Sequence, residues 1–467
     1  MERCFNMMEK LYRICPVFIQ NILISLYGFY WKNRRYGGVF KEKLNEYKLR
    51  ESFSKNDWEI YQEKELKKLL IHAFKTVPFY KELYNKKGFK LHDFENFSLE
   101  KLKKIPFLEK DDLRKYGTTL LLSENRKKGK FYASSGTTGT PIKIYFSTKF
   151  HQSWSALYEV RVRNWAGVNH KMSRAMIGGR RVLVTSKIKP PFHRYNFVEK
   201  QAYFSAYHIS NESSKIYIDE IIKVKPNYLV GYAKSIYLLA KVINEQKLKV
   251  PNMLAVLTSS EKLTKKMRVE IGTAFNCKVF DAYSGVEACG LISENKYNEL
   301  MFSPDSGILE VIDNEGVPVK NGEIGEVVFT GFLNYDQPLI RYKIGDRVKL
   351  AENQTSKSGL EMPIIEEIEG RIEDVIIGKE GQKMVRFHAI FVDIQSIIMA
   401  QVIQNSIEEI HIKLIVDNFY DASSEKIMID RIKNQLGDVN IIFEYVSTIE
   451  NSENGKYKAV ISHLKNE

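Results

Sequence analysis

The stretch that decides the fold is residues 225–287, KPNYLVGYAKSIYLLAKVINEQKLKVPNMLAVLTSSEKLTKKMRVEIGTAFNCKVFDAYSGVE. It contains three short apolar runs and two segments of helical spacing, in the chain order 228–230, 235–243, 253–257, 262–275 and 278–280. Such alternation predicts parallel strands covered by helices, which is the architecture of an α/β protein. A further helix is expected just before it, over 216–224, because Pro226 ends the helical pattern.

Polar residues follow all three predicted strands. They are Gly231-Tyr232, Thr258-Ser259-Ser260-Glu261 and Asp281-Ala282-Tyr283-Ser284-Gly285-Val286-Glu287. Ligands of open parallel sheets bind beyond the carboxyl ends of the strands. Two of these ends carry hydroxyl groups and carboxylates, so we expect a functional site at this edge.

Outward from this stretch, the pattern changes twice. After Ser303, short strands with Gly, Asn and Asp turns predict an antiparallel barrel or sheet. From Gly370 on, strands over 410–416 and 441–446 flank a helix over 424–436. We therefore expect a large N-terminal domain over 1–369, made of parallel β/α subdomains plus a small β-barrel-like subdomain. Residues 370–467 are expected to form a small mobile α+β domain, and residues 1–80 a helical segment.

Residues 15–31 are strongly apolar but carry one polar stripe, formed by Asn21, Ser25, Gly28 and Lys32 at helical spacing. The stretch is short for a membrane span and lacks the cleavage site of a signal peptide. Two interpretations stay open. The helix packs on the protein's own core, or it lies in a membrane interface with Lys32, Arg34 and Arg35 on acidic headgroups.

The charge is positive and uneven. Lysine plus arginine exceed aspartate plus glutamate by 71 − 57 = +14. Residues 370–467 hold 11 basic and 15 acidic residues, so the first 369 carry 60 − 42 = +18. A basic body favours nucleotides, phosphorylated carriers, acidic glycans or acidic lipid surfaces. No nucleic-acid-binding motif accompanies the charge, so we expect no nucleic-acid partner.

The four cysteines form no paired or metal-binding pattern. They fit a reducing compartment and predict a cytoplasmic protein. If residues 15–31 bind lipid, the protein would be peripheral on the inner face of the membrane.

The most specific motif is the loop Ser134-Ser135-Gly136-Thr137-Thr138-Gly139-Thr140-Pro141-Ile142-Lys143, between predicted strands at 131–133 and 144–146. Its glycines allow a tight backbone with N–H groups pointing inward, and its hydroxyls add donors. This composition suits the β- and γ-phosphates of ATP. It is not a Walker A loop, since no Lys-Ser/Thr follows the second glycine at the required spacing.

This loop resembles the signature of the acyl-adenylate-forming superfamily. The segments 73–80, AFKTVPFY, and 225–232, KPNYLVGY, look like the phenylacetate–CoA ligase family, and more narrowly its branch found in capsular polysaccharide synthesis. The resemblance covers nearly the whole chain. It implies the acyl-adenylate-forming enzyme fold, with ATP and Mg²⁺ as cofactors and CoA as a candidate acceptor.

The resemblance also implies roles for individual residues around ATP. In the loop, Thr137 and Thr138 would act in catalysis, and Ser134, Ser135, Gly136, Gly139 and Lys143 would bind the nucleotide. At the strand ends, the nucleotide-binding residues would be Ser260, Glu261, Asp281, Ala282, Tyr283 and Ser284. The Tyr283 ring would lie on adenine, and Glu287 would hold Mg²⁺, where a hard carboxylate suits the cation. Val286 stands where the family has a hydroxyl residue.

Six further positions follow from the resemblance. Asp346 would accept hydrogen bonds from both ribose hydroxyls, Arg371 would contact the nucleotide, and Glu373 would be the interdomain hinge. Lys456 matches the catalytic lysine, although Lys458 competes for that role and the family's nearby proline is absent. His208 and Tyr232 are candidates for the acyl pocket.

The implied activity is ATP-dependent activation of a small-molecule carboxylate as acyl-AMP, followed by transfer to a nucleophile. An amine or a sugar of a glycan or lipid-linked saccharide would place the enzyme in surface polysaccharide modification by amide or ester formation. A CoA thiol would make it an aryl- or acyl-CoA synthetase. A third alternative is a membrane-associated scaffold in polysaccharide assembly that keeps the fold without the chemistry.

Overall fold

The computed structural model describes residues 12, 15–133, 142–178, 190–206, 209, 211–369, 376–384, 390–391, 394, 396–418, 420–449 and 460–464. Helices dominate the first part of this chain. They are α2 (Val17–Tyr36), α3 (Phe40–Leu49), α4 (Lys55–Thr76), α5 (Pro78–Lys86) and α6 (Lys110–Tyr116), with short 3-10 turns at Arg50–Ser52, Leu91–Phe94 and Leu99–Lys104.

Local sequence explains where the long helix α4 begins and ends. Ser54 and Asp57 form a capping box, in which the Asp57 N–H donates to Ser54 Oγ at 3.2 Å and the Ser54 N–H donates to Asp57 Oδ2 at 3.0 Å. Pro78 has no backbone N–H and takes the first position of α5, so α4 stops at Thr76.

Within the described residues, twelve strands form one large sheet. Its hydrogen-bonded order is β11-β12-β13-β14-β10-β9-β8-β7-β6-β3-β5-β4. The strands nearest β4 are β3 (Arg174–Gly178), β4 (His193–Asn196), β5 (Gln201–Ser205), β6 (Tyr228–Tyr232), β7 (Ala255–Ser259) and β8 (Lys278–Tyr283). Helices α8 (Asn211–Val224), α9 (Ala233–Glu245) and α10 (Lys265–Phe275) separate them in sequence, and α7 (Thr148–Tyr158) with a π-helical turn (Glu159–Asn164) precedes them.

The alternation predicted from the sequence is confirmed. β6 pairs in parallel with β7, and β7 with β8, in continuous register. The apolar positions of α9 that recur at helical spacing, Ile236, Leu239, Ala240 and Ile243, are all buried. The structure adds β3 and β5, which extend the parallel part beyond β6.

The antiparallel strands predicted after Ser303 are confirmed, but the antiparallel region begins earlier, at Ile292. Its strands are β9 (Ile292–Glu294), β10 (Leu300–Phe302), β11 (Gly307–Ile312), β12 (Ile324–Gly331), β13 (Tyr342–Leu350) and β14 (Ile364–Glu369). They are joined to the parallel part through β9, which pairs antiparallel with β8. The barrel-like region is therefore a continuation of the same sheet.

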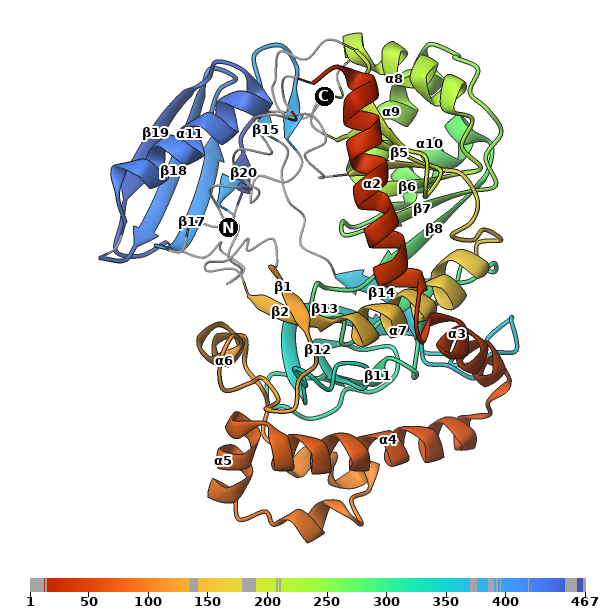
Figure 1. The fold of residues 1–467 in the computed structure, drawn as a ribbon, viewed down its shortest axis with the longest axis vertical. Helices are drawn as coiled ribbons and strands as arrows, with labels where there is room; N and C mark the ends of the chain where they lie inside the picture. Colours follow the sequence, from red (N-terminus) through yellow and green to blue (C-terminus); the bar gives the residue numbers. More distant parts are fainter. Residues whose placement is uncertain are drawn as a thin grey trace.

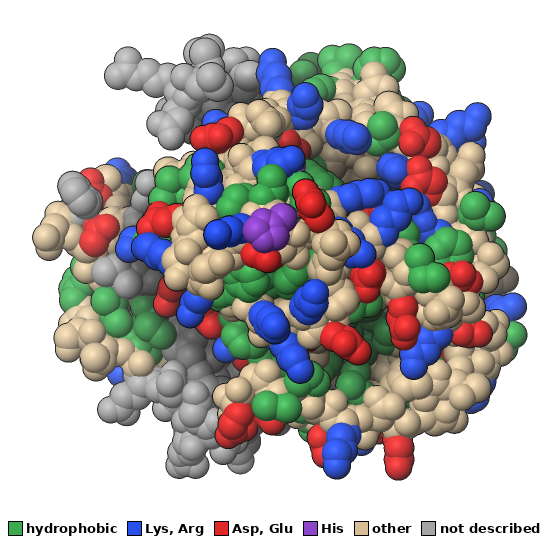
Figure 2. Space-filling model, turned by 90° about the horizontal axis from the view of Figure 1, so that it is seen from below, with side chains coloured by type: hydrophobic (Ala, Val, Ile, Leu, Met, Phe, Trp, Pro, Cys, Tyr) green, Lys and Arg blue, Asp and Glu red, His purple; other side chains and the backbone are tan. Residues whose placement is uncertain are grey.

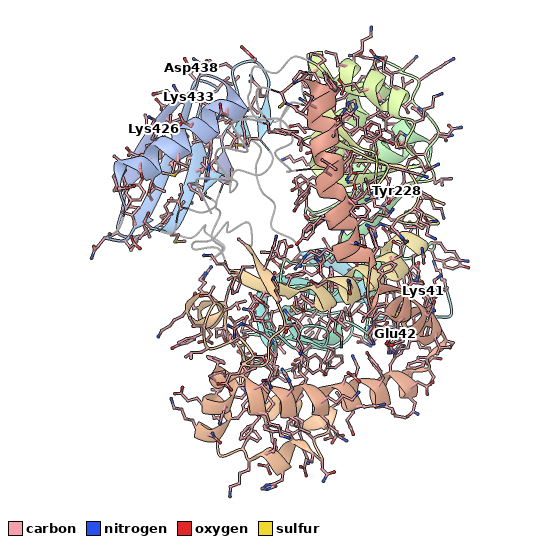
Figure 3. The ribbon with its side chains drawn as sticks, viewed as in Figure 1. Lys41, Glu42, Tyr228, Lys426, Lys433 and Asp438 are labelled. Atoms are coloured by element: carbon pink, nitrogen blue, oxygen red, sulfur yellow. The ribbon has the colours of Figure 1, made fainter. Side chains whose placement is uncertain are left out.

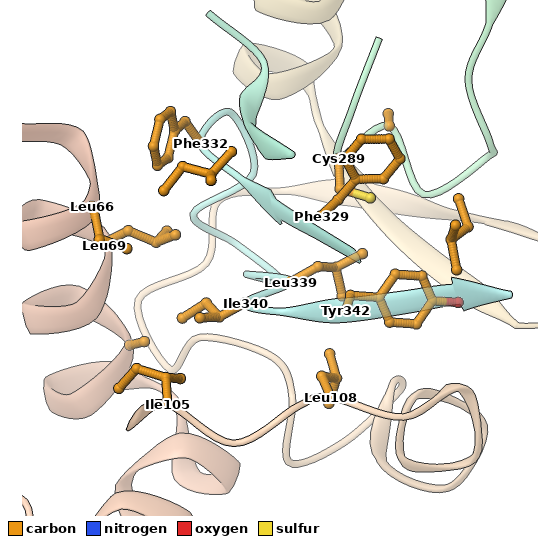
Figure 4. Close-up of a cluster of buried hydrophobic side chains, with 14 of the residues drawn as sticks. Leu66, Leu69, Ile105, Leu108, Cys289, Phe329, Phe332, Leu339, Ile340 and Tyr342 are labelled. Atoms are coloured by element: carbon orange, nitrogen blue, oxygen red, sulfur yellow. The ribbon is translucent and has the colours of Figure 1, made fainter. Parts of the chain in front are cut away.

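The antiparallel strands and the first helices share one hydrophobic core. Leu66 and Leu69 of α4 face Phe329, Phe332 and Leu339 in this cluster (Figure 4), and all five side chains are buried. Figure 1 shows α4 running along the antiparallel strands. Burial of large apolar side chains is the main favourable term in folding, so this contact fixes the N-terminal helices to the sheet.

Residues from 376 on have a separate core. Strands β17 (Ile397–Gln404), β18 (Glu409–Val416), β19 (Asn440–Tyr445) and β20 (Val460–Ser462) form a sheet in the order β19-β18-β17-β20, with α11 (Ala422–Leu436) packed on it. β15 (Ile376–Ile377) and β16 (Lys383–Met384) form a small hairpin. Lys433 at the end of α11 pairs with Asp438 at 2.8 Å (Figure 3). The domain boundary at 370 lies outside the described residues and stays a prediction.

Helix α2 packs on the protein, as one of the two interpretations of residues 15–31 expects, but it does so with its polar stripe. Ser25 and Gly28 are buried and Asn21 is half-buried, while Lys32 and most apolar side chains of the helix stay exposed. The expected headgroup role of Arg34 and Arg35 is contradicted. Arg34 is buried and donates to the Phe146 carbonyl at 2.7 Å, and Arg35 pairs with the buried Glu199. Among the described residues, none of the helices combines the length and the hydropathy needed to cross a membrane.

Candidate active site

The carboxyl ends of β7 and β8 meet as predicted, and their polar side chains are hydrogen-bonded. Thr258 Oγ1 of β7 donates to Asp281 Oδ1 of β8 at 3.0 Å. The Ala282 N–H donates to the same carboxylate oxygen at 3.0 Å. Asp281 is therefore held in place by groups from two strands.

Burial changes the acidity of Asp281. The pKa of the Asp281 carboxyl is raised to about 7, mainly by burial. The Thr258 hydrogen bond opposes this rise, and the neighbouring Glu294 carboxylate contributes to it. The folded protein thus binds a proton at Asp281 between about pH 4 and 7 that the unfolded chain releases.

We expect Asp281 to make stability depend on pH in a defined direction. A carboxyl group whose pKa is raised on folding contributes stability at low pH, and this contribution is lost as the pH rises through about 7. The unfolding temperature of the wild type should therefore fall relative to that of Asp281→Asn between pH 5 and 8. Differential scanning calorimetry at several pH values measures this. The exposed Glu315→Gln is the matched control, and a wild-type/Asp281→Asn difference that is constant with pH would contradict the assignment.

Glu261 caps the start of helix α9. One of its carboxylate oxygens accepts from the Lys234 N–H at 2.9 Å, in the first turn of α9. A carboxylate at a helix N-terminus satisfies a backbone donor and interacts favourably with the helix dipole. Ser260 beside it has φ +72°, a left-handed conformation that is uncommon for a residue with a side chain. The end of β7 is thus tied to the start of α9, next to Tyr232.

Tyr283 and Asp346 are brought together from positions 63 residues apart. The Tyr283 hydroxyl donates to Asp346 Oδ2 at 2.7 Å. Asp346 lies where the pairing of β12 with β13 shifts register, just after Gly345 with φ +83°. Bulges of this kind re-aim side chains beside functional sites, and here the bulge sets the carboxylate against the end of β8.

Glu287 is buried in the loop after β8. Its Oε1 accepts from the Tyr342 hydroxyl at 3.1 Å. A Cβ on Gly285 would lie 2.2 Å from Glu287 Oε2, so the glycine leaves room for this side chain. Burial raises the pKa of Glu287, while the Lys110 ammonium lowers it.

The described residues include no cluster of three or more histidine, cysteine or acidic side chains that would bind a metal unaided. Mg²⁺ at nucleotide sites is held by one or two carboxylates together with phosphate oxygens. A single buried carboxylate at Glu287 fits that requirement.

The strands around the predicted phosphate loop form a hairpin. β1 (Gly129–Ala133) pairs antiparallel with β2 (Lys143–Ser147), with Ala133 opposite Lys143. Lys143 is half-buried, and its carbonyl accepts from Gln337 Nε2 at 3.3 Å. The hairpin is thereby fixed to the loop that leads into β13.

Several predicted residues lie outside the described residues, and their roles stay predictions. They are Ser134, Ser135, Gly136, Thr137, Thr138, Gly139, His208, Arg371, Glu373 and Lys456, together with the competing Lys458. Of the described candidates, Tyr232, Ser260 and Glu261 lie at the ends of β6 and β7, Asp281 to Glu287 at the end of β8, and Asp346 on β13. Ser284 Oγ donates to the Gly285 carbonyl at 3.2 Å.

Sequence reasoning missed two residues that touch this site. Tyr342 bonds Glu287, and the Lys110 ammonium acts on the same carboxylate while donating to the Ile344 carbonyl at 3.4 Å. Tyr342 stands in the segment RYKIGD at 341–346, four residues before the predicted Asp346, and this proximity was the only available signal. Nothing local marked Lys110.

Comparison of the sequence with known proteins gives several matches. Residues 376–463 match the model of the CapK C-terminal domain. The chain is 29% identical to protein CapK of Staphylococcus aureus, over 98% of this chain and 100% of that protein. It is 26% identical to a phenylacetate-coenzyme A ligase of Aromatoleum evansii, over 70% of this chain and 73% of that one.

A solved structure shows the same fold. The 2-hydroxyisobutyryl-CoA ligase in complex with 2-HIB-AMP and CoA matches with a TM-score of 0.58 and 17% identity, covering 88% of this chain and 91% of the other. At this identity the match concerns the fold alone. The chain therefore has the fold of the adenylate-forming ligases, and its similarity to CapK and to phenylacetate–CoA ligases confirms the resemblance that its motifs indicated.

Proposed function

We propose that the protein is an ATP-dependent ligase that activates a carboxylic acid as acyl-AMP and passes the acyl group to a nucleophile. The observation that carries the proposal is the meeting of Tyr283, at the end of β8, with Asp346 on the bulge of β13. The resemblance predicts an adenine contact for the first and a ribose contact for the second. Similarity to phenylacetate–CoA ligases supports the same reaction class.

In the proposed first step, a carboxylate oxygen of the substrate attacks the α-phosphorus of ATP. The bond to the pyrophosphate oxygen breaks, pyrophosphate leaves, and a mixed anhydride forms. Asp346 holds the ribose, and its carboxylate has lone pairs for both hydroxyls beyond the bond it accepts from Tyr283. The loop 134–143 would bind the β- and γ-phosphates. Mg²⁺ bound at Glu287 would neutralise charge on the leaving group.

Lys456 is proposed to stabilise the charge that develops between the carboxylate and the α-phosphate. In the second step, the unit from 370 on would rotate about Glu373, remove Lys456 and admit the nucleophile. The attack breaks the acyl–oxygen bond and releases AMP. This role of the C-terminal unit is drawn from the resemblance, and its separate hydrophobic core is compatible with movement as one body.

For the acceptor, we favour an amine or a sugar of a surface polysaccharide precursor over CoA. The full-length similarity to CapK supports this choice, while the shorter similarity to phenylacetate–CoA ligases supports a CoA thiol as the second candidate. Transfer to an amine would form an amide and transfer to a hydroxyl an ester, each with release of AMP.

The experiment that tests the proposal is ATP–pyrophosphate exchange over a panel of aryl acids, fatty acids, amino acids and uronic acids. We expect exchange that depends on both Mg²⁺ and one class of acid. A second assay adds CoA, amines or sugar acceptors to the active acid and measures AMP release. Absence of both Mg·ATP binding and exchange for every acid would favour the non-catalytic scaffold. Its support in the sequence is Val286 in place of a hydroxyl residue and the missing proline near Lys456.

A further inference from the structure

Helix α2 turns an apolar face away from the protein. Phe18, Ile22, Leu26 and Phe29 recur at spacings of four, four and three, so they share one face of the helix. Their side chains are 64%, 49%, 66% and 65% exposed. Tyr27 and Tyr30 border this face and are also exposed. A contiguous exposed apolar surface of this kind is uncommon on soluble proteins and marks an interaction site.

The opposite, polar side of α2 is the side that contacts the protein. It covers β4, the edge strand of the sheet: the Tyr195 N–H donates to Asn21 Oδ1 at 2.9 Å, and the Phe197 N–H just beyond the strand donates to Ser25 Oγ at 3.0 Å. A Cβ on Gly28 would lie 2.3 Å from Asn196 Nδ2, so the glycine permits close approach. These contacts satisfy an otherwise open strand edge. The helix is therefore fixed in the orientation that exposes its apolar face.

The surroundings of this face are basic. Residues 17–36 contain no aspartate or glutamate, and Lys32 near the end of the helix is exposed. Residues 125–133 also contain no acidic residue and carry the exposed Lys127, Lys128 and Lys130. The Lys130 ammonium lies 5.3 Å from the centre of the Tyr30 ring, so the two segments adjoin. By contrast, the face seen in Figure 2 carries acidic and basic side chains interspersed.

We propose that α2 docks along its length in the interface of a membrane that contains acidic phospholipids. Its exposed Phe18, Leu26 and Phe29 would enter the boundary between headgroups and acyl chains, while Lys32 and Lys130 contact anionic headgroups. An apolar face with aromatic and basic residues at its border, on a helix unable to span, is typical of interfacial helices. The lack of acidic residues in these two segments favours an anionic lipid surface over a protein partner.

This docking would bring strand β1 close to the membrane. The Trp31 ring lies 6.3 Å from the ring of Tyr132, which belongs to β1, the strand that leads into residues 134–141. An acceptor attached to a lipid would then be near the site. The docking itself rests on α2 and its neighbours and stands whether or not the ligase proposal holds.

The test is sedimentation of the full-length protein with vesicles of phosphatidylcholine alone or with about one third phosphatidylglycerol. We expect binding to the acidic vesicles that weakens at 1 M salt, and binding at least about tenfold weaker to the neutral ones. The double variant Leu26→Asp, Phe29→Asp should lose at least about tenfold in affinity. The matched control is Ile60→Asp, Val269→Asp, which changes two exposed apolar residues on α4 and α10 and should bind normally.

Two measurements keep the outcomes distinct. Lys32→Glu with Lys130→Glu should remove the preference for acidic vesicles, and the thermal unfolding temperature of each variant shows that the protein is folded. If the aspartate pair disturbs folding, Leu26→Ser with Phe29→Ser replaces it. Wild-type protein that ignores acidic vesicles would overturn the proposal. The proposal would also be overturned by a concentration-dependent dimer that Leu26→Asp, Phe29→Asp abolishes without changing vesicle binding. In that case a second copy of the chain would cover the apolar face of α2.

Discussion

A Lys456→Ala protein is expected to form acyl-AMP about 10²–10³-fold more slowly than the wild type, while its binding of Mg·ATP changes little. One preorganised charge contact to a developing oxyanion contributes this much to a rate. The lysine is proposed to contact the reacting oxygens only in the first step. The measurement is acid-dependent ATP–pyrophosphate exchange under saturating ATP.

Lys458→Ala is the matched control, because Lys458 stands two residues away in the same motif. It should keep exchange within a few-fold of wild type. Supplied with preformed acyl-AMP and acceptor, Lys456→Ala should transfer the acyl group at a near-normal rate. Normal exchange by Lys456→Ala would show that the lysine has no such role, and loss of exchange only in Lys458→Ala would move the role to that residue.

An Asp346→Ala protein is expected to bind ATP about 10²-fold more weakly. Hydrogen bonds to a charged group contribute about 1.5–3 kcal/mol each, and the carboxylate is proposed to accept one from each ribose hydroxyl. The variant also leaves the hydroxyl of the half-buried Tyr283 without the acceptor it has 2.7 Å away. Equilibrium titration with Mg·ATP, or the KM for ATP in exchange, measures the effect.

Tyr283→Phe is the companion variant for Asp346, since it keeps the ring and removes only the hydroxyl that bonds the carboxylate. Its affinity should fall about tenfold or less. Wild-type protein should discriminate strongly against 2′,3′-dideoxy-ATP, and Asp346→Ala should not, because only a site built to bond hydroxyls rejects their absence. If both proteins discriminate equally against 2′,3′-dideoxy-ATP, Asp346 does not bind the ribose hydroxyls and has only a structural role.

The parallel part of the fold was predictable because its signals are local. Apolar strands of three to five residues, separated by helices whose apolar residues recur at helical spacing, leave little choice of fold class. The strands β6, β7 and β8 lie where expected within about three residues at each end. Their carboxyl ends also brought the polar residues together, as the Thr258–Asp281 contact shows. That contact follows from parallel pairing alone.

The orientation of α2 was not predictable. A polar stripe on an apolar helix can hydrogen-bond equally well with water or with the open edge of a strand. The sequence does not show which of the two it contacts. Asn21 and Ser25 are one helical turn apart, which matches alternate N–H groups of the extended chain at Tyr195 and Phe197. That match depends on β4 being the last strand of the sheet, a property of the whole topology.

The pairing of Tyr283 with Asp346 depends on tertiary structure in the same way. The sequence marked both residues, and the bulge in β13 sets the distance between them. Tyr342 and Lys110 became visible only through their effects on Glu287. Contacts made by such distant residues carry no periodic signal along the chain.

The most direct test of the central claim uses the acid found active in the exchange panel, with both carboxylate oxygens labelled with ¹⁸O. After complete turnover with ATP and acceptor, AMP and pyrophosphate are isolated and their ¹⁸O content is measured by mass spectrometry. Attack on the α-phosphorus predicts one ¹⁸O atom in the phosphate of AMP and unlabelled pyrophosphate. ADP together with ¹⁸O-labelled inorganic phosphate would place the attack on the γ-phosphorus and contradict the account.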